Sequence, residues 1–190
     1  MFFSLWYNLY ILKNFIFYYQ KRDVFMNTKK FTLTAMFTAL VCVATMVIYI
    51  PAPNGYINMG DAVLLLSAFL LGPVSGAICG GLGSCLADIF LSFPAYAPAT
   101  FIIKFLMGYT AGVIVRKKSS FLFTVIASLV AEIIMVLGYF LFEAFVLDLG
   151  VSVFFVSIPG NLMQSLGGII ISVLLFSVLK KNKYIVNLTK

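Results

Sequence analysis

Long uncharged apolar stretches alternate with short polar breaks along this chain. The interval from Lys30 to Asp61 encloses 30 uncharged residues, and the interval from Asp148 to Lys180 encloses 31. A helix needs roughly 20 residues to cross a hydrocarbon core of ~30 Å. Division at the remaining charges and at Gly/Pro breaks predicts six helices. They are expected at residues 31–50, 58–72, 74–91, 99–115, 121–142 and 157–180.

Basic residues cluster beside alternate ends of these helices. Lys29–Lys30, Arg116–Lys118 and the lysines of 180–183 all fall on one side of a six-span arrangement, and the loops on the other side are nearly free of Lys and Arg. Cytoplasmic loops carry such an excess of positive charge. We therefore expect an all-α integral membrane protein, a six-transmembrane-helix bundle with both termini cytoplasmic.

Composition agrees with a lipid-embedded chain. Hydrophobic residues make up 63% and charged residues 10%, against about 45–50% and about 25% in soluble domains. That much apolar surface excludes intrinsic disorder. The net charge of +7 belongs to scattered helix ends, so no nucleic-acid partner is expected. Histidine is absent and the three cysteines have no metal-binding spacing, so we expect no metal and no cofactor.

The first 25 residues do not fit the six-helix pattern. They are rich in aromatic residues, but Asn8, Lys13 and Asn14 interrupt them. They could form a seventh span or an interfacial helix, or they could precede a natural start at Met26. We expect residues 1–25 to be an extension and residues 26–190 to form a single six-helix membrane domain.

Polar side chains inside the predicted helices gather in one half of the bundle. Ionisable groups within a membrane are costly and by default indicate a functional site. Here nearly all of them lie in the outer half, with Glu132 near the middle of its helix, whereas the cytoplasmic halves are apolar. This asymmetry predicts a blind cavity that opens outward. Tyr56, Asp88, Glu132 and Glu143 belong to this outer polar group. The candidate substrate-binding residues are Asn58, Asp61, Tyr96, Thr100, Lys104, Tyr139, Asn161 and Gln164.

Purely structural roles remain open for several of these residues. Asn58 could cap a helix that has Asp61 in its first turn. Lys104 could form an ion pair with Asp88 or with a glutamate, and Glu132 could be protonated or bonded to a neighbouring helix. Tyr96 and Tyr139 could belong to the aromatic belt at the membrane interface.

The first predicted helix carries a broad face of small residues, namely Thr34, Ala35, Thr38, Ala39 and Cys42. Small residues let transmembrane helices approach closely. The face could serve internal packing, or it could be a docking surface for another membrane protein.

Catalytic motifs are missing from the sequence. There is no phosphate-binding loop of the Walker type and no Gly-x-Ser-x-Gly motif, and without histidine a Ser-His dyad is impossible. We therefore expect no enzyme. A bundle with an outer cavity and no ATPase of its own would need a partner that supplies energy. Two alternatives remain, an autonomous secondary permease and a structural membrane scaffold.

Four short stretches resemble a known family. They are GYINMGD at residues 55–61, LGPVSG at 71–76, GGLGS at 80–84 followed by Ala87-Asp88, and APAT at 97–100 leading to Lys104 and Gly108. From Met26 to residue 183 the chain resembles the substrate-binding S components of energy-coupling factor (ECF) transporters. It is most similar to the group related to the riboflavin and hydroxymethylpyrimidine/pyridoxine types.

The resemblance implies a six-helix protein of the prokaryotic plasma membrane that captures a vitamin or vitamin precursor from outside. It also implies partners, a transmembrane T protein and two ATPase subunits. Ala35 and Ala39 match the family's Ala-x-x-x-Ala motif, which contacts the T protein. The segment at 51–58 matches a loop that covers the ligand, and binding residues come from helices four to six.

Overall fold

The computed structural model describes residues 28–52, 55–182 and 185. It divides into two compact units, Met1–Thr32 and Leu33–Lys190. The expected extension at residues 1–25 lies outside the described residues. The following description concerns the second unit, together with the start of the helix that enters it.

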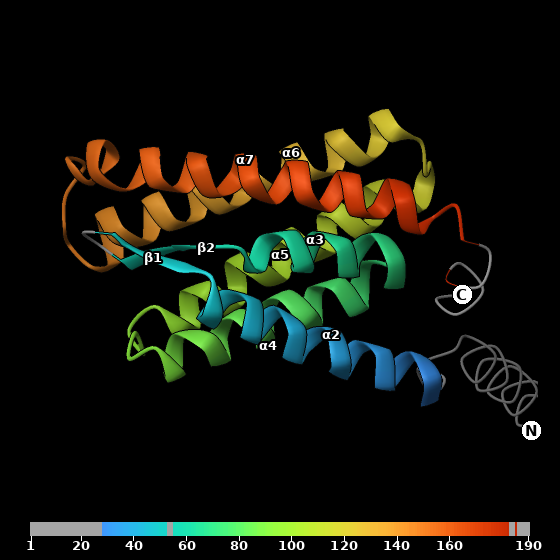
Figure 1. Ribbon diagram of the computed structural model, residues 1–190. Coiled ribbons are helices and arrows are strands. Elements are labelled where there is room, and N and C mark those ends of the chain that lie inside the picture. The colour runs from blue at the N-terminus through green and yellow to red at the C-terminus, as the bar shows by residue number, and fades with distance from the viewer. Residues whose placement is uncertain (1–27, 53–54, 183–184, 186–190) are drawn as a thin grey trace, which may run out of the picture. The chain divides into compact units, whose positions relative to one another are not determined.

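Six α-helices account for most of the described chain, and their order matches the six predicted segments (Figure 1). Five of them are long and apolar enough to cross a membrane, whereas α3 has only 12 residues. The sequence also predicts a short second helix. The helices are α2 (Thr28–Val47), α3 (Gly60–Leu71), α4 (Pro73–Phe90), α5 (Ala97–Lys117), α6 (Phe121–Leu141) and α7 (Val153–Leu179).

An antiparallel hairpin corrects the all-α expectation. The first predicted helix was to continue to Ile50, but α2 ends at Val47 and the chain then forms β1 (Tyr49–Ala52) and β2 (Gly55–Asn58). Ile50 pairs with Ile57 in the hairpin register. Proline and glycine indicate a break in the helix at this point. The isoleucines and tyrosines on either side of the break lie in the two paired strands.

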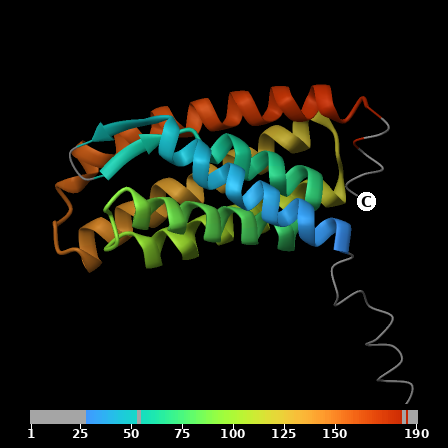
Figure 2. The same ribbon diagram turned by 60° about the horizontal axis from the view of Figure 1, so that its bottom comes forward.

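The hairpin lies over the end of the bundle where α7 begins, and Figure 2 shows it beside the first turns of that helix. A π-helical turn (Phe142–Val146) extends α6 toward the same end. Helix α7 begins at Val153, earlier than the predicted start near residue 157. Arg116–Lys118 and Lys180–Lys181 lie at the opposite end, where α5 and α7 terminate.

Helix α3 forms the centre of the bundle. Ten of its 12 residues are buried, and it contacts α4, α5 and α7. Glycines permit this packing, because a Cβ on Gly76 would lie 2.5 Å from the Ala68 Cα and one on Gly108 would lie 2.3 Å from the Gly76 carbonyl oxygen. Small residues allow backbones in membranes to approach this closely. The short helix therefore holds its polar first turn in a fixed position.

Helix α2 is the least buried of the five long helices, with 22% of its most apolar window buried against 33–56% in the others. The face of small residues on this helix is buried along one edge only. Thr34 and Cys42 are buried, whereas Ala35 and Ala39 are exposed. Packing on α4 occurs at Gly83, where a Cβ would lie 2.7 Å from the Thr38 carbonyl oxygen.

Candidate functional site

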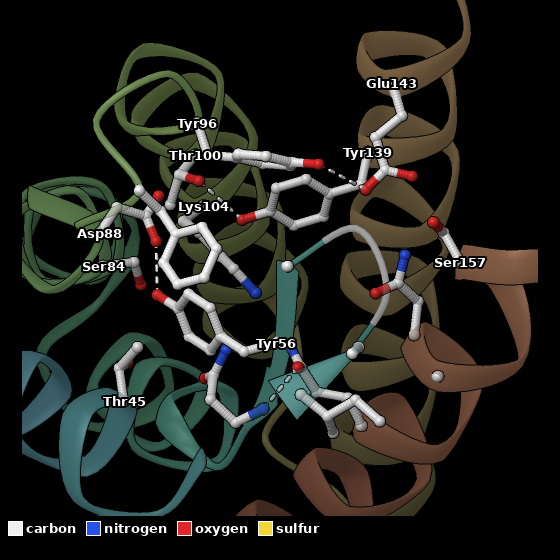
Figure 3. A pocket seen from close by; sticks show the side chains of 18 of the residues that line it. Thr45, Tyr56, Ser84, Asp88, Tyr96, Thr100, Lys104, Tyr139, Glu143 and Ser157 are labelled. Carbon is white, nitrogen blue, oxygen red and sulfur yellow. Dashed lines mark hydrogen bonds between the residues drawn. The ribbon is translucent and has the colours of Figure 1, made fainter. Parts of the chain in front are cut away.

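A pocket lies beneath the hairpin, walled by α4, α5, the α6 end with its π-helical turn, and the start of α7 (Figure 3). Its volume is about 60 Å³, counted over the positions that the centre of a water molecule can take. Seven of the eight candidate residues line it, namely Asn58, Tyr96, Thr100, Lys104, Tyr139, Asn161 and Gln164. Asp61 does not line the pocket and contacts two residues that do.

An ion pair between Lys104 and Asp61 forms the base of the pocket. Both side chains are almost fully buried, with exposed fractions of 2% and 1%. The structure therefore decides against the alternative pairing of Lys104 with Asp88 or a glutamate. The reason is positional, because the first turn of the central helix α3 places its carboxylate directly against α5.

Gln164 links this ion pair to the hairpin. Its Nε2 donates to Asp61 Oδ2 at 2.5 Å, and its Oε1 accepts from the Asn58 backbone N–H at 2.8 Å. The Asn58 side chain accepts from the Gly60 N–H at 2.9 Å, as a helix-capping residue does, although Met59 occupies the N-cap position. The polar residues of α3, α5, α7 and the end of β2 thus form one connected network.

Asp88 at the end of α4 accepts a hydrogen bond from the Tyr56 hydroxyl on β2. Burial and the Asp88 charge raise the pKa of Tyr56 above its usual value, so the phenol stays protonated and donates. This contact joins the hairpin to the pocket wall, and it supplies the partner that a carboxylate at a helix C-terminus needs.

Two further tyrosines point toward the pocket (Figure 3). The Tyr139 hydroxyl donates to Thr100 Oγ1 at 3.0 Å, and the Tyr96 hydroxyl donates to Glu143 Oε1 at 3.3 Å. Burial and the nearby Glu143 charge raise the pKa of Tyr96. Both rings therefore line the pocket, which argues against a role in the interface belt.

Glu132 lies behind the pocket and does not line it. Its Oε2 accepts from the Ser165 hydroxyl of α7 at 3.1 Å. This contact matches the alternative in which Glu132 bonds to a neighbouring helix. Among the described residues no group of three or more Cys, Asp or Glu could hold a metal ion.

Several pocket residues were left out of the candidate set. Tyr56, Asp88 and Glu143 line the pocket, although the sequence placed them only in the outer polar group. Thr45, Ser84 and Phe93 also line it. The hairpin brings Tyr56 over α4, and the only local signal for that pairing is the β-branched and aromatic character of residues 49–58.

One buried hydroxyl on the pocket wall, Thr45 Oγ1, has no hydrogen-bond partner among the described residues. Such groups are rare in folded proteins because desolvation without a partner is costly. The wall carboxylates are better satisfied, because Thr100 also hydrogen-bonds to Asp88 and Ser157 to Glu143.

Comparisons with known proteins agree with this architecture. A solved structure described as the S component of a bacterial ECF transporter superposes with a TM-score of 0.69 at 24% identity, over 82% of this chain and 98% of the other. An uncharacterized protein of Pyrococcus woesei is 36% identical over 143 residues, 74% of this chain and 95% of its own length.

A thiamine precursor transporter of Lactococcus lactis is 32% identical over 118 residues, which is 60% of this chain and 67% of that protein. The sequence profile of the "ECF-type riboflavin transporter, S component" family matches residues 25–181. That match spans all six helices. The chain therefore belongs to the family of ECF transporter S components, multi-pass proteins of the prokaryotic cell membrane.

Proposed function

We propose that this protein captures a small vitamin-type molecule at the outer face of the membrane and delivers it through an ATP-driven partner module. Family membership supports a substrate-binding transporter subunit rather than an enzyme. The observation that carries the proposal is a partly polar, partly aromatic pocket at one end of an otherwise apolar bundle. Such pockets bind small molecules with a few precisely placed polar groups.

The positions of the basic residues support an outward-facing pocket. Arg116–Lys118 and Lys180–Lys181 lie at the end of the bundle opposite the hairpin. By the positive-inside rule that end faces the cytoplasm. The pocket then opens toward the exterior, with the hairpin as its cover. Two hydrogen bonds hold the hairpin over the pocket, one between Tyr56 and Asp88 and one between Asn58 and Gln164. A ligand in the pocket would contact the same residues.

The pocket is large enough for a small ligand. About 60 Å³ is open to the centres of water molecules. A thiamine precursor is the ligand class in the name of the Lactococcus relative, and we propose a vitamin or precursor of similar kind for this pocket.

Mass spectrometry of small molecules retained by the detergent-purified protein tests the proposal. A bound vitamin or precursor is expected. In proteoliposomes the chain alone is expected to bind the molecule, and sustained uptake should require the T protein, the two ATPase subunits and ATP. Uptake by the chain alone in an ion gradient would instead support a secondary permease, and absence of any retained or added ligand would support a structural role.

Cysteine labelling in intact cells tests the sidedness. Ser157 lines the pocket, and Ser119 is exposed in the loop between α5 and α6. The substitutions Ser157→Cys and Ser119→Cys are therefore matched isosteric changes at the two ends. Both are made in a protein from which the three native cysteines have been removed. A membrane-impermeant maleimide is expected to label only the Ser157→Cys protein from outside. Labelling of that position only after the cells are opened would contradict an outward pocket.

A further inference from the structure

A buried glutamate behind the pocket has no role in the proposed capture of a ligand. Glu132 on α6 is 2% exposed, and its Oε2 contacts the Ser165 hydroxyl of α7. Its other oxygen, Oε1, has no hydrogen-bond partner within the described part of the chain. An ionised carboxylate with a bare oxygen is costly to bury, so the structure must either supply a cation or keep Glu132 neutral.

The groups that face Glu132 do not supply a cation of its own. Asp61 faces it from α3 and Lys104 from α5, but these two are bound to each other. Helix α7 has no ionisable residue, and Tyr139, the other ionisable residue of α6, points toward the pocket. A Cβ on Gly168 would lie 2.7 Å from Glu132 Oε1 and 3.2 Å from the Asp61 Cβ. Two acidic side chains thus pack against one glycine, with a single ammonium group facing them among the described residues.

The Ser165 hydroxyl indicates how Glu132 stays neutral. Ser165 Oγ lies 2.8 Å from the Asn161 carbonyl oxygen and 3.1 Å from Glu132 Oε2. A hydroxyl has one hydrogen to donate, and a serine within a helix commonly gives it to the carbonyl four residues before it. When Ser165 donates to Asn161, the direction of its contact with Glu132 is reversed, and the hydrogen between them belongs to the carboxyl group.

We infer that Asp61, Glu132 and Lys104 form a proton-binding site behind the pocket, in which Glu132 holds one proton in the folded protein. With that proton the three side chains have no net charge, and the ion pair between Asp61 and Lys104 is undisturbed. Glu132 Oε1 is then the carbonyl oxygen of a neutral acid, which costs less to leave without a partner than a carboxylate oxygen does. The inference does not depend on which molecule the pocket binds.

The bound proton makes Glu132 a positioning residue for the pocket. Its hydrogen bond to Ser165 joins α6 to α7 at the residue next to Gln164. The Gln164 side chain in turn contacts Asp61 and the Asn58 backbone N–H at the end of β2. Release of the proton would place a second negative charge beside Asp61, and so weaken the link from α7 to the hairpin.

Infrared spectroscopy of the purified protein, in a detergent without ester groups, tests the inference without a ligand. The C=O band of a protonated carboxyl group is separate from the bands of ionised carboxylates. A solvent-exposed glutamate, with a pKa of about 4.3, is ionised at neutral pH, so wild type is expected to show there an acid component that Glu132→Gln lacks. Asp148→Asn, an exposed change in the loop after α6, is the control and should keep this component. Acid bands of equal intensity in wild type and Glu132→Gln would overturn the inference.

Changes to the other two groups count the protons. Asp61→Asn leaves Lys104 without its carboxylate, so Glu132 is expected to give up its proton and pair with Lys104. The acid band should then lose the Glu132 component. Lys104→Met should have the opposite effect, because Asp61 takes up a proton and the band gains a second component. An Asp61→Asn protein that keeps the Glu132 component would contradict a site in which the three residues share one proton.

The pH dependence of unfolding measures the same proton. The unfolded chain releases it above about pH 4.3, whereas folded wild type keeps it, so folding becomes less favourable as the pH rises. The unfolding constant of wild type should therefore increase relative to that of Glu132→Gln by up to about tenfold per pH unit, until the folded protein also loses the proton. Equal pH profiles would refute the inference. Glutamine has the shape of the protonated acid, so this comparison decides even where Asp61→Asn or Lys104→Met does not fold.

Two neutral variants separate the positioning role from the charge. Glu132→Gln keeps a donor for Ser165, whereas Glu132→Leu does not. Hydrogen exchange at the β2 amides is expected to be about 2- to 10-fold faster in Glu132→Leu than in Glu132→Gln, which corresponds to the loss of one hydrogen bond. Equal exchange in the two variants would rule out the positioning role. None of these measurements uses a ligand, so their failure would leave the proposed capture function in place.

Discussion

Replacing Lys104 by methionine is expected to destabilise the folded protein by about 3–5 kcal/mol. Removal of one partner from a buried ion pair leaves the other charge uncompensated, and Asp61 is only 1% exposed. Gln164 remains as a donor to Asp61, which satisfies one oxygen but not the charge. The free energy of unfolding in mixed micelles measures the effect.

The double variant Lys104→Met with Asp61→Asn distinguishes a charge effect from a packing effect. It removes both charges and keeps an acceptor for Gln164, so it should recover most of the lost stability. Lys181→Met, the same substitution at an exposed position beyond α7, is the matched control and should change stability little. Losses that simply add in the double variant would show that the ion pair is not the cause.

Replacing Ala35 or Ala39 by tryptophan is expected to weaken co-purification with a T protein by about 10- to 100-fold, while ligand binding stays unchanged. The prediction follows from the proposed partner module. Both alanines are exposed on the least buried long helix, and a small-xxx-small strip lets a second helix approach closely. An indole on that strip would separate the two helices by overpacking.

Ile133→Trp provides the control for a bulky residue on the membrane-facing surface. Ile133 is 56% exposed on α6, away from α2 in sequence and fold. This variant should co-purify with the T protein as wild type does. Normal co-purification of the Ala35→Trp and Ala39→Trp proteins would move the docking surface elsewhere, and loss of ligand binding in them would show that the change reaches the interior.

The number and order of the helices could be predicted because apolar stretches of membrane length are a local property of the sequence. Their boundaries were less accurate where local signals were mixed. Proline and glycine at 51–55 indicated only a break, and the structure forms a hairpin there whose pairing of Ile50 with Ile57 is decided across the turn. Helix α7 likewise begins before its predicted start, because the residues from Val153 onward are as apolar as the helix itself.

The polar residues of the site could be selected but not paired. Depth along each helix predicted that Lys104, Tyr139 and Gln164 gather at one end, and all three line the pocket. Depth alone left several acidic partners open for Lys104. Asp61 is its partner because the glycines of α4 and α5 allow a short central helix to place its first turn against α5.

Hydrophobicity, charge position and motif spacing are properties of the linear chain. They were enough to predict a helical membrane protein of the S-component type with polar groups at one end. Which polar groups bond to one another became clear from the packing of the helices and the hairpin. The hairpin brings Tyr56 to Asp88, and the end of α6 brings Glu143 to Tyr96. Those contacts join residues far apart in sequence, so they depend on how the helices and the hairpin pack.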